Sequence, residues 1–361
     1  MSYQTPIQNL SLLKYLELSF FDVRQLPNSI VKLKSCPTKW ENSATRGILS
    51  LNMQRPKVWE SFYSRRLGEV YQLKRFPVCD GKGDISGCNI RLLKDLNKLK
   101  GYLSVERLEG GRVKVIDAKD AHLKEKHELI GVELDFKVGK NDIVGSALEQ
   151  KGLLEALEPP HGIESLAICD YKGERPVWYL DTNYVDLQTL RLQCFSLWAT
   201  VIGIKSLEKL EVNTCPTLCE LPSMPMLKSL KIRSYDGLNT IGDLPNLDWL
   251  QVEGCGSLEK FSHGMPALKW LDVYGCYKLK TLANMPVLKW LEVRYCERLE
   301  QVADVHMPDL KRLWLSNLNT LKQLPAHLPS LEDLRAWNLP NWEGWPAAGS
   351  RELATETFMH A

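Results

Sequence analysis

Cysteine is the residue type in this sequence whose chemistry has to be considered first. The chain has ten cysteines, and four of them, Cys215, Cys255, Cys276 and Cys296, are separated by 40, 21 and 20 residues, which are multiples of about 20. A zinc site needs closely spaced ligands such as a Cys-x-x-Cys pair, and the sequence contains none. Because the spacing follows a repeat and not a ligand pattern, we interpret these four thiols as structural. We predict no metal and no redox site.

Catalytic and nucleotide-binding motifs are also missing from the sequence. The seven histidines are scattered, with no His-Glu-x-x-His, and there is no Gly-x-Ser-x-Gly. No Gly-x-x-x-x-Gly-Lys-(Ser/Thr) phosphate cradle occurs, since Gly81-Lys82-Gly83 lacks the upstream glycine and the hydroxyl residue. We therefore predict that the chain is not an enzyme and that it holds no cofactor.

Tryptophan is the residue type that points to recognition. The chain has eleven tryptophans, and Trp249, Trp270 and Trp290 each stand directly before a leucine in successive segments of similar sequence. Tryptophan contributes strongly to binding when its ring is accessible. Its function here depends on the elements that position it, which are set by an internal repeat.

The repeat has the frame Leu-x-x-Leu-x-(Val/Ile/Leu) and continues with further apolar positions. Seven copies begin at Leu207, Leu227, Leu247, Leu268, Leu288, Leu310 and Leu331. A period of 20 to 22 residues lies at the short end of the leucine-rich-repeat range. The alternating Leu-x-Val predicts a short strand with two side chains buried, and stacked copies share one core. Prolines before most copies favour irregular return segments over helices.

The predicted fold is therefore an α/β solenoid, a leucine-rich-repeat horseshoe with a parallel sheet on its concave face and a mostly irregular convex side. Two helical insertions are expected in the N-terminal half, over Asp117–Ile130 and over about 143–157. We predict one solenoid over residues 1–361, divided into an N-terminal repeat (1–33), irregular or degenerate repeats (34–91), loose repeats with helical segments (92–186), regular repeats (187–345) and a C-terminal tail (346–361).

The predicted strands place a set of aromatic and basic side chains on the concave face. Trp249, Trp270 and Trp290 would form one column with neighbours about 5 Å apart. The predicted protein-binding residues are Trp249, Trp270, Trp290, Trp314, Trp337, Tyr274, Lys231, Arg233, Arg294, Arg312 and Arg335. Carboxylates are mixed among them, which favours a protein partner over nucleic acid. Two alternatives remain: the tryptophans cover only their own neighbours, or the register is shifted by one residue and they face inward.

Three segments in order carry a resemblance to a known family. Leu92–Gly101, Asp117–Lys126 with Leu129–Phe136, and Leu153–Pro160 resemble the leucine-rich-repeat region of plant coiled-coil nucleotide-binding leucine-rich-repeat (NLR) disease-resistance proteins. The sequence lacks their phosphate-binding motif and shows no heptad coiled coil before Leu13. The resemblance implies a recognition module in plant defense that binds a pathogen effector or the receptor's own nucleotide-binding domain. The alternative is a generic scaffold, an adaptor or a truncated decoy receptor without switching activity.

Composition sets the remaining expectations. Lys and Arg number 46 against 44 Asp and Glu, so no strong basic field favours nucleic acid or an anionic membrane. The N-terminus has no secretory signal pattern, and no apolar run reaches the ~18 residues that span a bilayer. We expect a cytoplasmic protein, with the nucleus as a further possible location, and no membrane partner.

Overall fold

The computed structural model describes residues 71–341, apart from 79–88, 109–112, 138–144, 181–183, 195–203, 216–220, 222, 234–236, 243, 262–264, 283, 301, 303–306 and 323–327. The predictions for 1–33, for most of 34–91 and for 346–361 lie outside the described residues. The chain divides into two compact units, Met1–Tyr184 and Val185–Ala361. The single solenoid and its subdivision therefore stay predictions, and each unit is described by itself.

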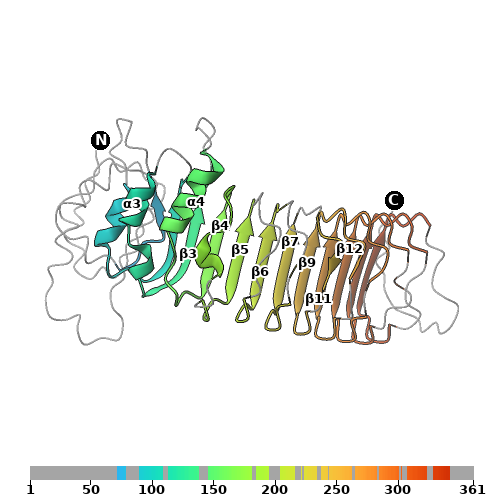
Figure 1. Ribbon diagram of the computed structural model, residues 1–361. Helices are drawn as coiled ribbons and strands as arrows, with labels where there is room; N and C mark the ends of the chain where they lie inside the picture. The colour runs from blue at the N-terminus through green and yellow to red at the C-terminus, as the bar shows by residue number, and fades with distance from the viewer. Residues whose placement is uncertain are drawn as a thin grey trace, which may run out of the picture. The chain divides into compact units, whose positions relative to one another are not determined.

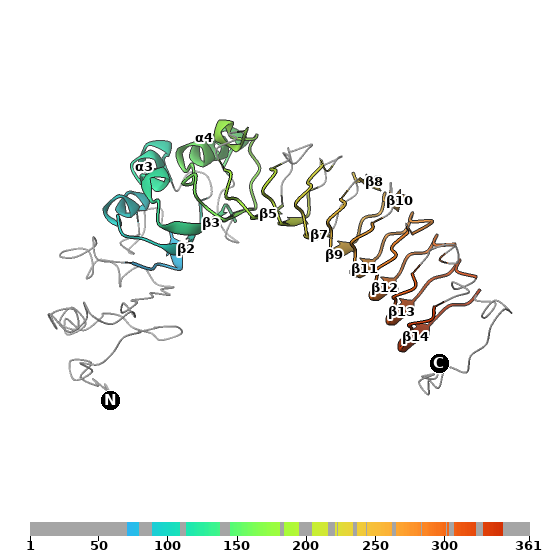
Figure 2. The same ribbon diagram turned by 90° about the horizontal axis from the view of Figure 1, so that it is seen from below.

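The first unit contains a parallel sheet with helices in its connections. Strands β1 (Arg75–Pro77), β2 (Gly101–Glu106), β3 (Leu129–Asp135) and β4 (Ser165–Cys169) pair in this order. The connecting helices are η3 (Ile90–Asp95), α3 (Val115–Lys119), η4 (Leu123–Glu125), α4 (Ala147–Ala156) and η5 (Val177–Leu180). In Figures 1 and 2, α3 and α4 lie on one side of this sheet.

The helix α4 confirms the second predicted insertion. Ser146 is its N-cap: its hydroxyl accepts a hydrogen bond from the Glu149 amide, and the Glu149 carboxylate accepts one from the Ser146 amide. This reciprocal pair satisfies two backbone donors that the helix itself leaves without partners. Leu153 and Leu154 are buried, so the helix packs one face onto the unit's core. Pro159 and Pro160 follow its end, as the sequence predicts.

The first predicted insertion, over Asp117–Ile130, is wrong in extent. The α-helix α3 has only five residues, and His122 then takes a left-handed conformation with φ of 49°. A single turn of 3-10 helix follows, and Leu129 already begins strand β3. The chain has to return to the sheet within this stretch, so pairing with β2 overrides local helix propensity. Lys126 lies in the return, buried, with its Nζ donating to the Leu96 carbonyl at 3.2 Å.

The second unit is built from regular repeats. Its strands are β5 (Thr189–Gln193), β6 (Lys209–Asn213), β7 (Ser229–Arg233), β9 (Trp249–Glu253), β11 (Trp270–Tyr274), β12 (Trp290–Arg294), β13 (Arg312–Ser316) and β14 (Asp333–Trp337). They pair in parallel in this order, residue to residue. The described return segments include β8 (Thr240–Ile241) and β10 (Lys260–Phe261), which lie opposite the sheet in Figure 2. The described part of this unit contains no helix, which confirms the predicted irregular return side.

The core of the second unit consists of the repeated apolar positions. In β11, for example, Leu271 and Val273 have no exposed surface, and Trp270 and Tyr274 point to the opposite face. Each buried leucine contacts the equivalent leucine in the neighbouring coils, since Leu250, Leu271 and Leu291 pair in register. The predicted parallel-sheet leucine-rich-repeat fold is confirmed.

The cysteine column lies just after the strands and is buried. Each thiol hydrogen-bonds a backbone carbonyl two residues earlier: Cys215 to Asn213, Cys255 to Glu253, Cys276 to Tyr274 and Cys296 to Arg294, at 3.4 to 3.8 Å. A hydrogen bond with Cys276, together with burial, raises the pKa of the Cys296 thiol far above its usual range. The neutral thiol satisfies carbonyls where the chain turns away from the sheet.

One residue with positive φ follows most strands of the second unit. The non-glycine examples are Cys194, Thr214, Tyr295, Asn317 and Asn338, and Gly254 and Gly275 occupy the same place. Its amide donates to the last carbonyl of the next strand, as Gly275 does to Arg294 at 2.9 Å and Tyr295 to Ser316 at 3.1 Å. The left-handed residue thus extends the ladder of hydrogen bonds by one rung.

Candidate protein-binding face

The candidate site is the open face of the second unit, defined as the side chains at the first, third and fifth positions of its strands. All eleven residues predicted from the sequence lie on it, in the predicted columns. Trp249, Trp270 and Trp290 pair in register at the first position. The alternative of a register shifted by one residue is wrong, because leucines and valines occupy the inward positions.

Four tryptophans form a continuous row, called here the Trp ladder: Trp249, Trp270, Trp290 and Trp314. Their successive ring centroids are 4.6, 6.4 and 4.7 Å apart, and the first two rings are parallel to within 5°. All four side chains are half-buried. The rings therefore cover one another in part, which agrees in part with the alternative that the tryptophans cover their own neighbours. They still contribute to the surface.

Two arginines lie against the end of the ladder. The Arg312 guanidinium is 5.1 Å from the Trp290 ring centroid, and that of Arg335 is 4.1 Å from Trp314. Asp333 accepts a hydrogen bond from the Trp314 indole at 3.2 Å and lies 3.4 Å from the Arg335 Nε. These contacts fix the rings and leave Arg312 exposed at their side.

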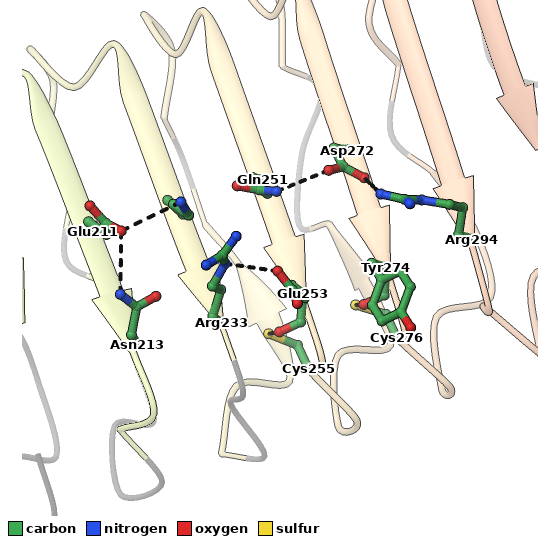
Figure 3. Close-up of polar contacts among 11 residues, drawn as sticks. Glu211, Asn213, Arg233, Gln251, Glu253, Cys255, Asp272, Tyr274, Cys276 and Arg294 are labelled. Carbon is green, nitrogen blue, oxygen red and sulfur yellow. Dashed lines mark hydrogen bonds and ion pairs between the residues drawn. The ribbon is translucent and has the colours of Figure 1, made fainter. Parts of the chain in front are cut away.

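A belt of polar contacts crosses the middle of the face (Figure 3). Glu211 lies 3.6 Å from Lys231, Arg233 pairs with Glu253 at 2.8 Å, and Gln251 donates to Asp272 at 3.0 Å. Arg294 lies 3.5 Å from Asp272 and 3.1 Å from Glu292. Burial raises the pKa of Glu292. The predicted binding residues Lys231, Arg233 and Arg294 are thus already paired within the chain.

A second aromatic group lies where strands β11 and β12 end, called here the strand-exit patch: Tyr274, Tyr277 and Tyr295. Their exposed fractions are 37%, 51% and 44%. The rings of Tyr274 and Tyr295 meet edge to face with centroids 5.3 Å apart, and the Arg294 guanidinium lies 5.3 Å from the Tyr274 centroid. Further along the same face, Trp337 is 46% exposed.

Sequence reasoning missed Tyr277 and Tyr295. Both follow the strand and so fall outside an alternation of inward and outward residues. One feature of the sequence could have drawn attention to Tyr295: it occupies the repeat position at which the preceding repeats have Gly254 and Gly275. A tyrosine with φ of 54° is conformationally unfavourable at this position, where glycine and asparagine are tolerated better.

Metal-binding clusters and membrane-spanning helices are both absent from the part of the chain that the structure describes. In the described segments, no group of three or more His, Cys, Asp or Glu side chains is arranged to hold a metal ion. The helices within the described ranges are all too short or too polar to cross a membrane.

Comparison with known proteins finds sequence similarity to plant disease-resistance proteins. Residues 90–215 match the family model described as R13L1/DRL21 LRRs. The chain is 30% identical over 166 residues to "Putative disease resistance protein At3g14460" and 29% identical over 162 residues to "Putative disease resistance RPP13-like protein 1", both of Arabidopsis thaliana. These alignments cover 44% and 43% of the chain, which spans 10% and 14% of the two relatives.

Among solved structures, the leucine-rich repeat domain of the type III effector XCV3220 (XopL) matches with a TM-score of 0.34 and 20% identity. That alignment covers 69% of this chain and 72% of the other. The fold assignment rests on the strand register and on the family match. The family match also bears out the resemblance seen in the sequence. Over part of its length the chain is therefore similar to leucine-rich repeats and to plant disease-resistance proteins.

Proposed function

We propose that the open face of the second unit binds a protein, and that this recognition serves plant defense. The observation that carries the proposal is the combination, on one face, of the Trp ladder with the exposed Tyr274, whose ring contacts Tyr295. Large aromatic side chains grouped on a surface mark interaction sites, and Trp, Tyr and Arg are enriched among residues that dominate binding energy. We propose a recognition module and not an enzyme, acting in the cytoplasm or nucleus.

The relatives support this proposal and suggest the partner. Both Arabidopsis relatives are named as disease resistance proteins, and the matched part of this chain is their repeat region. We propose that the partner is a pathogen effector or the nucleotide-binding domain of a receptor. The second possibility requires a receptor that carries both parts, because this sequence contains no phosphate cradle.

The test begins with capture and ends with purified partners. The full chain is immobilised, proteins from infected plant tissue are identified, and each candidate is then purified and its Kd measured. Replacing Trp249, Trp270 and Trp290 by Ala should weaken binding by about 2 kcal/mol or more, roughly 30-fold. The control replaces Lys260 and Lys280 by Ala, two exposed lysines outside the open face.

Circular dichroism and thermal unfolding must show that both variants remain folded. Equal binding of purified partners to the wild type and the tryptophan variant would overturn the proposal. So would a loss of binding confined to the control variant.

A further inference from the structure

The charges of the open face are matched unequally. The open face is bordered by a row of residues called here the leading edge, which consists of the residue just before each strand. Among the described residues of the face and this edge, each carboxylate has a cation within 4 Å: Glu208 with Lys228, Glu211 with Lys231, Asp248 with Lys269, Glu253 with Arg233, Asp272 and Glu292 with Arg294, Glu332 with Lys311, and Asp333 with Arg335. The unmatched charges are therefore all positive.

Two of the unmatched cations are neighbours of Trp290, Lys289 in the sequence and Arg312 in space. Lys289 directly precedes Trp290 and is exposed, and Arg312 is exposed with its guanidinium 5.1 Å from the Trp290 centroid. On the leading edge Lys289 stands between Lys269 and Lys311, whose carboxylate partners are Asp248 and Glu332. Neither Lys289 nor Arg312 has an ion pair with a described residue. The other unmatched cations, Arg191 and Lys209, lie on β5 and β6, away from the ladder.

We propose that the partner presents an acidic segment to this face, with carboxylates that reach Lys289 and Arg312 and an apolar side chain that covers the Trp290 ring. The inference rests on the proposed function and names the partner's chemistry. A carboxylate here would form charge-assisted hydrogen bonds next to a half-buried indole, where water is displaced and the attraction is stronger than in bulk solvent.

The pattern fits a protein segment better than a nucleic acid. A nucleic acid needs a continuous basic path along its phosphates. On this face the carboxylates Asp272, Glu292 and Asp333 interrupt any such path. The aromatic ring of Trp290, with Arg312 beside it and Lys289 preceding it in the sequence, instead suits a short segment in which acidic and apolar residues are neighbours.

The test selects peptides with the purified full chain from a phage library of random 12-residue peptides. The enriched pool should contain more Asp and Glu than the input library, together with aromatic or aliphatic residues. Synthetic peptides from the pool are then measured by calorimetry. The double variant Lys289→Glu, Arg312→Glu should lose at least about tenfold in affinity. The single variant Lys289→Gln leaves Arg312 and the tryptophan rings unchanged and should lose less affinity. Raising the salt concentration should weaken wild-type binding more than that of the double variant.

The matched control is Lys209→Glu, the same charge reversal at an unmatched cation on β6, four strands from β12. It should bind the peptides as the wild type does. Circular dichroism establishes that each variant is folded.

The outcomes separate the two proposals. Peptides that need Trp270 and Trp290 but show no acidic bias, or that bind the double variant unchanged, would overturn this inference and leave the proposed function standing. No enrichment, or enrichment independent of the ladder, would overturn both. Polyphosphate or single-stranded DNA bound through Lys289 and Arg312, with acidic peptides failing to bind, would assign the cations to phosphate and overturn the inference.

Discussion

Trp249 and Trp270 stack almost face to face, with ring centroids 4.6 Å apart and ring planes 5° from parallel. The two residues are 21 positions apart in the sequence and paired in register in the sheet. Aromatic pairs contribute about 0.5–1.5 kcal/mol beyond their area of burial. The stack therefore stabilises the fold as well as shaping the surface.

A double-mutant cycle measures that contribution. Trp249→Ala and Trp270→Ala, alone and combined, should give a coupling free energy of about 0.5–1.5 kcal/mol in urea unfolding. Trp249 and Trp314 lie at the two ends of the ladder and should show coupling near zero. Equal coupling in the two cycles would mean that stacking is not the cause.

The buried leucines carry most of the stability of each coil. Leu271 has no exposed surface, so Leu271→Ala should lower the free energy of unfolding by about 2–5 kcal/mol. The exposed Lys269, two residues earlier, forms only a surface ion pair with Asp248. Lys269→Ala should change stability by less than about 1 kcal/mol. Chemical denaturation of both variants checks the contrast, and a small effect of Leu271→Ala would contradict the proposed packing.

Tyr295 should trade stability against recognition. Its φ of 54° is unfavourable for a bulky side chain, and asparagine tolerates this conformation, as at Asn317 and Asn338. Tyr295→Asn should therefore raise the free energy of unfolding by up to about 1 kcal/mol, less the lost contact with Tyr274. If the strand-exit patch belongs to the binding site, the same variant binds the partner more weakly. Thermal unfolding and Kd measurements on one preparation test both halves, and a variant that is less stable and binds equally well contradicts them.

Lys126 predicts a pH dependence in the first unit. Burial lowers the pKa of Lys126 to about 8, against the opposing influence of Glu125 and Asp95. In the unfolded chain the pKa is 10.5, so between pH 8 and 10.5 the unfolded state binds more protons than the folded state. The free energy of unfolding should consequently rise with pH in this window, by about 3 kcal/mol at most.

The matched variant for this prediction is Lys126→Met, which nearly keeps the length of the side chain and removes its titrating amine. The difference between the wild-type and variant unfolding free energies should change from pH 8 to 10.5. If the unfolding free energies of the wild type and the variant changed with pH in parallel, Lys126 would not be buried as a charged group at neutral pH.

The repeat made the second unit highly predictable from the sequence. A period near 20 residues sets which side chain pairs with which, and strand alternation sets which face each one occupies, so Trp249, Trp270 and Trp290 could be placed in one column. The pairing of Arg294 with both Asp272 and Glu292 could not be predicted, because long side chains choose among several partners within reach. The early end of the Asp117–Ile130 helix depended on the pairing of β3 with β2, which the helical spacing of the preceding residues does not reveal.

The in-register pairing of β9, β11, β12 and β13 also changes how sequence variation at this face should be interpreted. Positions 249, 270, 290 and 312 are direct neighbours in space, whereas residues 270 and 271 face opposite sides of the sheet. Exchanges at positions separated by 20 to 22 residues can thus compensate for one another, whereas two adjacent positions within a strand belong to opposite faces of the sheet. A new binding preference can be assembled from single substitutions in different coils, without altering any one coil as a whole.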